Sequence, residues 1–457
     1  MASEIRVNQI QSRTGVSTVS FTDSGPIFAG ISTVQGTLIV DGGITGNVTG
    51  NVTGDITSSG TSTLGNTVVG GGTTELIVNG DARITGILTV GTASVTLNGN
   101  DGVVSGINTI NGVTMPAAGG LTNRNMIING GCKVSQRGTS FTGLTAGQYT
   151  VDRMLFGLSS GNSGTWTVQQ STDAPDGFKY SVKCTNTVAF PASPIAGAYV
   201  YFPHLIESQD LQHLKFGTSE AETTTLSFWV KSNVTGNYSF GILQNDNSLK
   251  QVAFTYTINA ASTWEYKTIT IPGDTAGVID SDNDKGLQLE WWLNSGSTYT
   301  GGSAQSTWTT FDNTHRNFNN PGVGNNTSDF WQITGIQFEV GDRATPFEHR
   351  SYSYELARCQ RYYEIIAHFS GSTNYGTIWS KPLNTFTNCW TDVRFKVTKR
   401  APNYDFGLLG SAAWNGTAPT AHKDGVDAIV LQASGHYYLT GGSSSARDMA
   451  YVDAELF

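Results

Sequence analysis

Residues 330–339 read FWQITGIQFE, a run rich in β-branched and aromatic residues and free of proline. Side chains of this kind favour extended backbone and half-buried sheet surfaces. Comparable runs recur between residues 121 and 350, separated by segments rich in Gly, Asn, Ser and Asp that are typical of turns. The pattern predicts an antiparallel, jelly-roll-like β-sandwich within an all-β chain. The predicted strands are Thr165–Gln169, Tyr180–Cys184, Ala198–Phe202, Thr224–Lys231, Tyr238–Gln244, Val252–Ile258, Glu265–Ile271, Gly286–Trp292 and Phe330–Glu339.

The first 120 residues have a different composition. They hold two of the chain's 48 aromatic residues, Phe21 and Phe28, no lysine and 23 glycines. Residues 44–57 read ITGNVTGNVTGDIT, a short repeat of Gly, a polar residue, Val or Ile, and Thr. Such a segment can hardly bury a core alone, yet it is too rich in β-branched residues for a free linker. It predicts an elongated β-stalk intertwined with copies of itself, with a disordered Gly/Thr linker as the alternative.

Composition and turn signals divide the chain into five segments. The PAAGG sequence before Leu121 marks the start of the aromatic-rich part, and a helix is expected at Tyr354–Ile366, capped by Ser353. The five segments are a head piece at 1–31, a repetitive Gly/Thr/Val stalk at 32–120, the β-sandwich at 121–350, a connecting helix at 351–366 and a small β tip domain at 367–457.

Charge and cysteine content exclude several classes of partner. Only 13% of the residues are charged, the formal net charge is −9, and no Lys/Arg cluster could neutralise phosphates, so no nucleic acid is expected to bind. No apolar run reaches the ~18 residues of a membrane helix, and the opening residues lack the apolar core of a signal peptide. We therefore expect that the protein is made in a cytoplasm and does not insert into a membrane. The four cysteines form no CxxC pair and are expected to be buried thiols.

Two groups of motifs bracket the predicted sandwich. Residues 123–142 read NRNMIINGGCKVSQRGTSFT and are followed by YTVDR at 149–153. Residues 333–350 read ITGIQFEVGDRATPFEHR and lead into SYSYELARCQRYYE at 351–364. Together they resemble the receptor-binding part of tail fibre proteins from tailed bacteriophages, in which a carbohydrate-binding-module-like sandwich lies between such motifs. The N-terminal text also resembles tail and appendage proteins of cyanophages.

The resemblance implies a non-enzymatic, homotrimeric fibre of the virion tail, made in the host cytoplasm. Its N-terminus would attach to phage tail or baseplate proteins, and its C-terminal domains would bind a host-surface glycan or lipopolysaccharide. One alternative is a structural virion appendage or connector that binds no receptor. The other is a polysaccharide-degrading tailspike, which would need two facing carboxylates. The 35 Asp and Glu residues show no obvious pair of that kind.

Aromatic residues in polar, Gly-rich loops are the candidate ligand contacts, because the C–H faces of sugars stack on exposed rings. Packing in a trimer interface is the alternative for the same residues. Aromatic residues within strands, such as Phe228, Trp229, Trp331 and Phe338, are expected in the core. The candidate glycan contacts are Tyr299, Trp308, Trp414, Tyr437 and Tyr438.

Carboxylates at alternate positions, Asp280, Asp282 and Asp284, resemble part of a calcium loop. The glycine and glutamate that an EF-hand requires are replaced by Lys285 and Trp291. A looser calcium site and a solvated acidic turn both remain open. We expect no catalytic residues and no other cofactor.

Overall fold

The computed structural model describes residue 120 and residues 122–246, 249–368, 375–376, 389–408, 413–414, 420–422, 425–433, 439–440 and 448–456. Upstream it describes the short strands β1 (Ile87–Val90), β2 (Val95–Asn98), β3 (Val103–Ser105), β4 (Thr109–Ile110) and β5 (Val113–Thr114). The first three form an antiparallel sheet and the last two form a pair. The predicted head piece at 1–31 and most of the predicted stalk lie outside the described residues.

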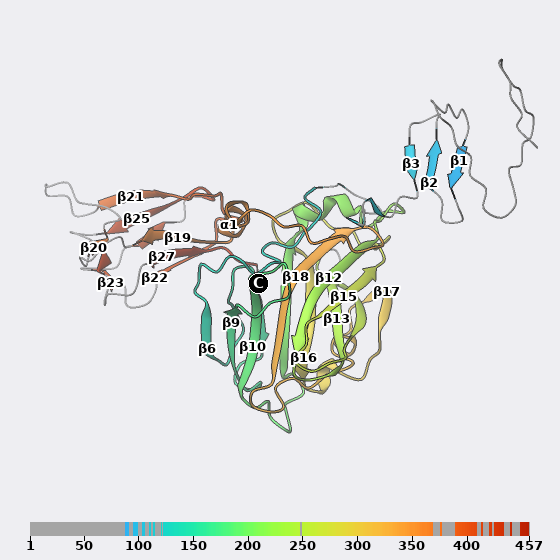
Figure 1. Cartoon of the computed structure of the whole chain (residues 1–457). Coiled ribbons are helices and arrows are strands. Elements are labelled where there is room, and N and C mark those ends of the chain that lie inside the picture. Colours follow the sequence, from blue (N-terminus) through green and yellow to red (C-terminus); the bar gives the residue numbers. More distant parts are fainter. Residues whose placement is uncertain are drawn as a thin grey trace, which may run out of the picture. The chain divides into compact units, whose positions relative to one another are not determined.

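Two antiparallel sheets form a β-sandwich (Figure 1). The six-stranded sheet has the order β15-β12-β18-β10-β9-β6, and the seven-stranded sheet has the order β17-β14-β13-β16-β11-β8-β7. The strands are β6 (Ser140–Leu144), β7 (Gln148–Tyr149), β8 (Leu155–Leu158), β9 (Thr165–Ser171), β10 (Ser181–Val188), β11 (Tyr199–Glu207), β12 (Thr224–Ser232), β13 (Gly236–Gln244), β14 (Lys250–Ile258), β15 (Glu265–Ile271), β16 (Lys285–Ser295), β17 (Gln305–Thr310) and β18 (Phe330–Val340).

All nine predicted strands are confirmed, with bounds that differ by a few residues. Sequence reasoning missed β6, β7, β8 and β17, which lie at or next to the sheet edges. Three of them have five residues or fewer, and β17 buries none of its side chains completely. Such strands carry little of the alternation by which buried strands are recognised.

The core lies between the two sheets and follows the period of two along each strand. Phe228, Trp331 and Phe338 are fully buried there, as expected. The prediction that Trp229 lies in the core is wrong, because its side chain is only half-buried. It follows Phe228 directly, so it projects from the opposite face of β12, away from the core.

The helix α1 (Tyr352–Gln360) begins earlier and ends sooner than predicted. Its N-cap is Ser351, whose side chain accepts a hydrogen bond from Tyr354 N, and Ser353 lies inside the helix. The expected continuation to Ile366 is wrong, because Tyr363–His368 forms β19 and pairs with β27 (Asp448–Asp453). The β-branched pair Ile365 and Ile366 and the partner strand together favour extended backbone there.

The C-terminal part contains three small antiparallel sheets among the described residues, with the orders β19-β27-β22, β20-β26-β23 and β21-β25-β24. This confirms a strand-rich C-terminal part. Its further strands are β20 (Tyr375–Gly376), β21 (Cys389–Arg394), β22 (Asp405–Leu408), β23 (Ala413–Trp414), β24 (Thr420–His422), β25 (Ala428–Ala433) and β26 (Leu439–Thr440).

Cys132, Cys184 and Cys359 are buried free thiols, as expected. The side chain of Cys389 lies outside the described residues. In the part of the chain that the structure describes, no helix is both long and apolar enough to cross a membrane.

Candidate functional site

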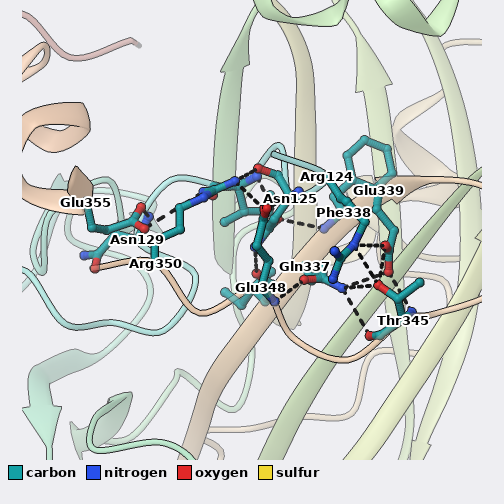
Figure 2. A network of polar contacts seen from close by, with 12 residues as sticks. Arg124, Asn125, Asn129, Gln337, Phe338, Glu339, Thr345, Glu348, Arg350 and Glu355 are labelled. Carbon is teal, nitrogen blue, oxygen red and sulfur yellow. Dashed lines mark hydrogen bonds and ion pairs between the residues drawn. The ribbon is translucent and has the colours of Figure 1, made fainter. Parts of the chain in front are cut away.

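The two motif groups of the sequence fold together into one polar network (Figure 2). Asn125 Nδ2 donates to Ile336 O at 3.0 Å, while its Oδ1 accepts from the backbone N–H groups of Ile127 and Phe338 at 2.9 and 3.1 Å. Arg350 Nη1 in turn donates to Ile127 O at 3.1 Å. The asparagine therefore joins segments more than 200 residues apart and holds the start of the sandwich against its last strand.

A second part of this network surrounds the fully buried carboxylate of Glu339. It accepts hydrogen bonds from Gln337 Nε2 at 2.8 Å and from Thr345 N and Oγ1 at 2.9 and 2.6 Å. Arg124 Nε lies 3.3 Å from the same carboxylate. The motif side chains are thus engaged with one another, which gives them a role in the closure of the sandwich.

The YTVDR and QRG motifs bind the end of the chain to the sandwich. Arg153 is buried and pairs with Glu455, and its guanidinium lies 3.6 Å from the centroid of the Tyr362 ring. Arg137 Nη2 lies 2.9 Å from Asp453 Oδ2. Burial raises the pKa of Glu455, and the two arginines oppose this shift. These contacts too are structural, because they connect β27 and its extension to residues before β6 and β8.

Tyr299 lies in an aromatic cluster on the outer face of the seven-stranded sheet. Its ring centroid is 5.0 Å from that of Trp292 and 5.8 Å from that of Tyr199. Tyr201 stacks on Trp292 at 4.9 Å with an interplanar angle of 19°. The Trp292 ring is fully buried, whereas the three tyrosines are half-buried. We call Tyr199, Tyr201, Trp292, Tyr299 and Arg316 the Tyr299 cluster.

A buried ion pair fixes this cluster from beneath. Glu290 is fully buried and accepts from Arg316 Nε at 3.0 Å and Nη2 at 2.5 Å. Trp292 Nε1 at 2.9 Å and Gln288 Nε2 at 2.5 Å donate to the same carboxylate. The Arg316 guanidinium lies 4.7 Å from the Trp292 centroid and 5.5 Å from that of Tyr299. Burial alone would lower the pKa of Arg316, but Glu290 outweighs it and raises that pKa.

The chemistry open to the cluster follows from this geometry. Four donors occupy both oxygens of Glu290, so this carboxylate is engaged in structure and is not presented as a general base. The three tyrosines offer rings and hydroxyls held in place by Trp292 and Arg316. Burial raises the pKa of Tyr299 and of Tyr201, so both hydroxyls stay protonated at neutral pH. Rings with hydroxyls beside them suit the mixed apolar and polar surface of a sugar.

Trp308 is placed elsewhere, on β17. Its ring packs edge-on against Phe216 at 5.6 Å, and its Nε1 donates to Pro272 O at 2.7 Å. These contacts give Trp308 a packing role, and its contact with a glycan stays a prediction. Trp414 belongs to β23, but its side chain lies outside the described residues, as do Tyr437 and Tyr438.

The acidic turn at Asp280, Asp282 and Asp284 borders a cavity of about 560 Å³, together with Asn245, Asp246, Lys285, Arg400 and Leu456. Asp282 Oδ1 accepts from Asp284 N at 2.8 Å, so part of the turn's carboxylate capacity is used locally. Asp284 Oδ1 lies 3.5 Å from Arg400 Nη1. Among the described residues no group of three or more His, Cys, Asp or Glu is arranged to hold a metal ion. The calcium prediction therefore gains no support from this geometry.

Sequence reasoning found Tyr299 but missed its neighbours. The alternation of side chains along a strand could have revealed them. In YVY at 199–201 both tyrosines share one face, and in WW at 291–292 one ring faces the core and the other faces outward. Nothing local pointed to Arg316, which reaches the cluster from the segment after β17.

No family model matches the chain, and no curated protein matches it in sequence. Solved structures with a similar arrangement include the enzymatically active domain of tailspike protein 4 of bacteriophage CBA120. That match has 12% identity and a TM-score of 0.26, and it covers 47% of this chain but only 21% of the tailspike chain.

Two carbohydrate-binding modules are also similar. The family 11 module of Clostridium thermocellum, in complex with a mixed-linked tetrasaccharide, has 13% identity and a TM-score of 0.22, covering 46% of this chain and 99% of the module. A xylan-binding domain from Paenibacillus barcinonensis has 10% identity and a TM-score of 0.20, covering 45% of this chain and 94% of that domain. Likenesses this distant do not identify what this chain binds.

Proposed function

We propose that this chain is a non-enzymatic tail fibre of a tailed bacteriophage, of the cyanophage type, that binds a host-surface glycan or lipopolysaccharide. Its N-terminus attaches to tail or baseplate proteins of the virion, and the fibre is a homotrimer. The motifs at 123–153 and 333–364 support the proposal by their resemblance to tail fibre proteins. Each domain would bind weakly, and three copies on each of several fibres would increase the overall avidity by raising the effective concentration of binding sites.

The observation that carries the glycan-binding part is the Tyr299 cluster. Its three tyrosines are half-buried on the outer face of the seven-stranded sheet, and the guanidinium of Arg316, paired with the buried Glu290, lies beside the rings of Tyr201 and Tyr299. A pre-organised aromatic surface loses little conformational entropy when a sugar stacks on it. Since Glu290 is occupied by four donors, the cluster is suited to binding and not to hydrolysis.

Calorimetric titration of the purified chain with polysaccharide extracted from the host surface tests the proposal. We expect Tyr299→Ala to weaken binding by roughly five-fold or more, because one stacked ring contributes about 1 kcal/mol. Tyr352→Ala is the matched control, since that tyrosine is 56% exposed on α1 and lies outside the cluster. Equal binding by the wild type and the Tyr299 variant, or release of reducing ends from the polysaccharide, would count against the proposal.

A further inference from the structure

A strip of aromatic rings crosses the outer face of the other, six-stranded sheet. Trp229 on β12 and Tyr266 on β15 are directly opposite each other in the antiparallel register, with ring centroids 5.3 Å apart. Phe178, in the segment before β10, continues the strip and contacts Phe347 at 4.9 Å. Tyr266 is 44% exposed, and the other three rings are half-buried. This strip is separate from the Tyr299 cluster, which belongs to the opposite sheet.

Gly335 on β18 allows the strip to form. Its φ is +62°, a left-handed conformation that favours glycine. A Cβ at this position would come within 2.7 Å of Phe178 Cζ and 3.1 Å of Trp229 Cδ1. The missing side chain therefore leaves the space in which these two rings lie over the sheet.

Lysines flank the strip on the same face. The register places Lys231 of β12 and Lys183 of β10 opposite Gln332 of β18, so all three project outward while Trp331 and Ile333 face the core. Neighbouring strands are about 4.8 Å apart, so the two lysines originate about 10 Å from each other. Gln332 is neutral and fixed, since its amide donates to Ser181 Oγ and to Asp173 O.

The lysines near the strip differ in how closely they are paired. Lys231 is paired with Asp173 at 2.8 Å. Lys183 Nζ lies 4.4 Å from the centroid of the Phe330 ring, and the exposed Lys179 lies 5.1 Å from that of Tyr180. A ring attracts an ammonium group without neutralising it. Among the described residues, neither Lys183 nor Lys179 forms a close ion pair with a carboxylate, although the charge of Lys183 acts on Asp173 and helps to lower its pKa.

We propose that this face binds an acidic saccharide, with sugar rings on Tyr266 and Trp229 and a carboxylate or phosphate group at Lys183 and Lys179. The charge complementarity is local: the chain as a whole has a net charge of −9, yet two lysines on this face, Lys183 and Lys231, act on one carboxylate, Asp173. The inference rests on the proposed glycan-binding function and specifies its ligand class. A second contact surface on the same domain increases the effective concentration of a long polysaccharide.

The test uses the full chain and three polysaccharides: polygalacturonate as the uronate probe, phosphomannan as the phosphate probe, and neutral dextran. We expect an acidic probe to bind more tightly than dextran, and its binding to weaken between about 0.05 M and about 0.5 M NaCl. The variant Lys179→Gln/Lys183→Gln should bind the acidic probe roughly ten-fold more weakly, and Tyr266→Ala about five-fold. A preference for one acidic probe identifies the anionic group as uronate or phosphate.

Lys215→Gln/Lys396→Gln is the matched control, because it removes two lysines that are about half exposed elsewhere, 50% and 55%. Equal losses in this control and in the Lys179/Lys183 variant would overturn the proposal, as would binding that salt leaves unchanged. Loss of dextran or host-glycan binding in Tyr299→Ala, with the lysine variant behaving as wild type, would refute only this second surface. No binding of any probe or host glycan by the wild type would refute the glycan-binding function itself.

Discussion

The ion pair beneath the Tyr299 cluster can be tested by removing one partner and then both. Arg316→Met keeps much of the side-chain volume but removes two hydrogen bonds to Glu290, at 3.0 and 2.5 Å. The carboxylate left behind is fully buried and keeps only the neutral donors Gln288 and Trp292. Leaving a buried charge without its partner costs about 3–5 kcal/mol, so we expect a loss of about 3 kcal/mol in the free energy of unfolding.

The double variant Glu290→Gln/Arg316→Met separates the charge from the packing. It removes both charges while an amide remains to hydrogen-bond Trp292, so we expect it to recover most of the loss, to within about 1–2 kcal/mol of wild type. Denaturant unfolding followed by tryptophan fluorescence is the assay, because Trp166, Trp291 and Trp331 are also fully buried in the sandwich. A cost below about 1 kcal/mol for Arg316→Met, or a double variant no more stable than it, would refute the reasoning.

Three further predictions concern other parts of the molecule. Burial alone would raise the pKa of Glu207, but hydrogen bonds from Arg361 and Tyr362 outweigh it and hold that pKa below its ordinary value. The stability that Glu207 supplies is thus fully present above about pH 5 and is lost as the pH falls through its folded-state pKa. In acid unfolding, the difference in free energy of unfolding between the wild type and Glu207→Gln should therefore shrink towards about pH 3. A difference that stays constant with pH would contradict this. Asn125→Ala leaves the N–H groups of Ile127 and Phe338 unpaired and should cost about 2–4 kcal/mol in denaturant unfolding, whereas a control at the exposed Asn237 should change stability by less than about 0.5 kcal/mol. Sedimentation equilibrium of the full chain should give three times the 48.7 kDa chain mass, and a monomer mass would argue against the fibre.

The residues of the two motif groups lie in the network that closes the sandwich. Asn125, Glu339 and Arg350 belong to text that resembles tail fibre proteins, and the structure places all three in one network that closes the sandwich. Their hydrogen bonds join the first segment of the sandwich to its last strand. The candidate site instead lies on residues such as Tyr199 and Arg316, which belong to no motif in the sequence.

The candidate site was only partly predictable for a physical reason. Tyr299 was recognisable because an aromatic residue in a polar loop is costly to expose without a function or a packing partner. Trp308 met the same criterion, but Phe216 and the carbonyl of Pro272 supply its packing and its hydrogen bond. Loop composition shows that a ring needs a partner; it does not identify the partner.

The sequence by itself determined the nine longer strands of the sandwich, because such a strand is specified by neighbours along the chain: alternate side chains that can face one core, with turn residues between them. Tertiary structure decided everything that depends on residues far apart. It ended α1 at Gln360 because β27 pairs with the residues that follow. It brought Arg316 to Glu290, 26 residues away, and thereby placed its guanidinium 5.5 Å from the centroid of the Tyr299 ring. Local pattern limits the backbone conformation of each segment, whereas the partner of each outward-facing side chain is set by sheet order and register, which no local pattern encodes.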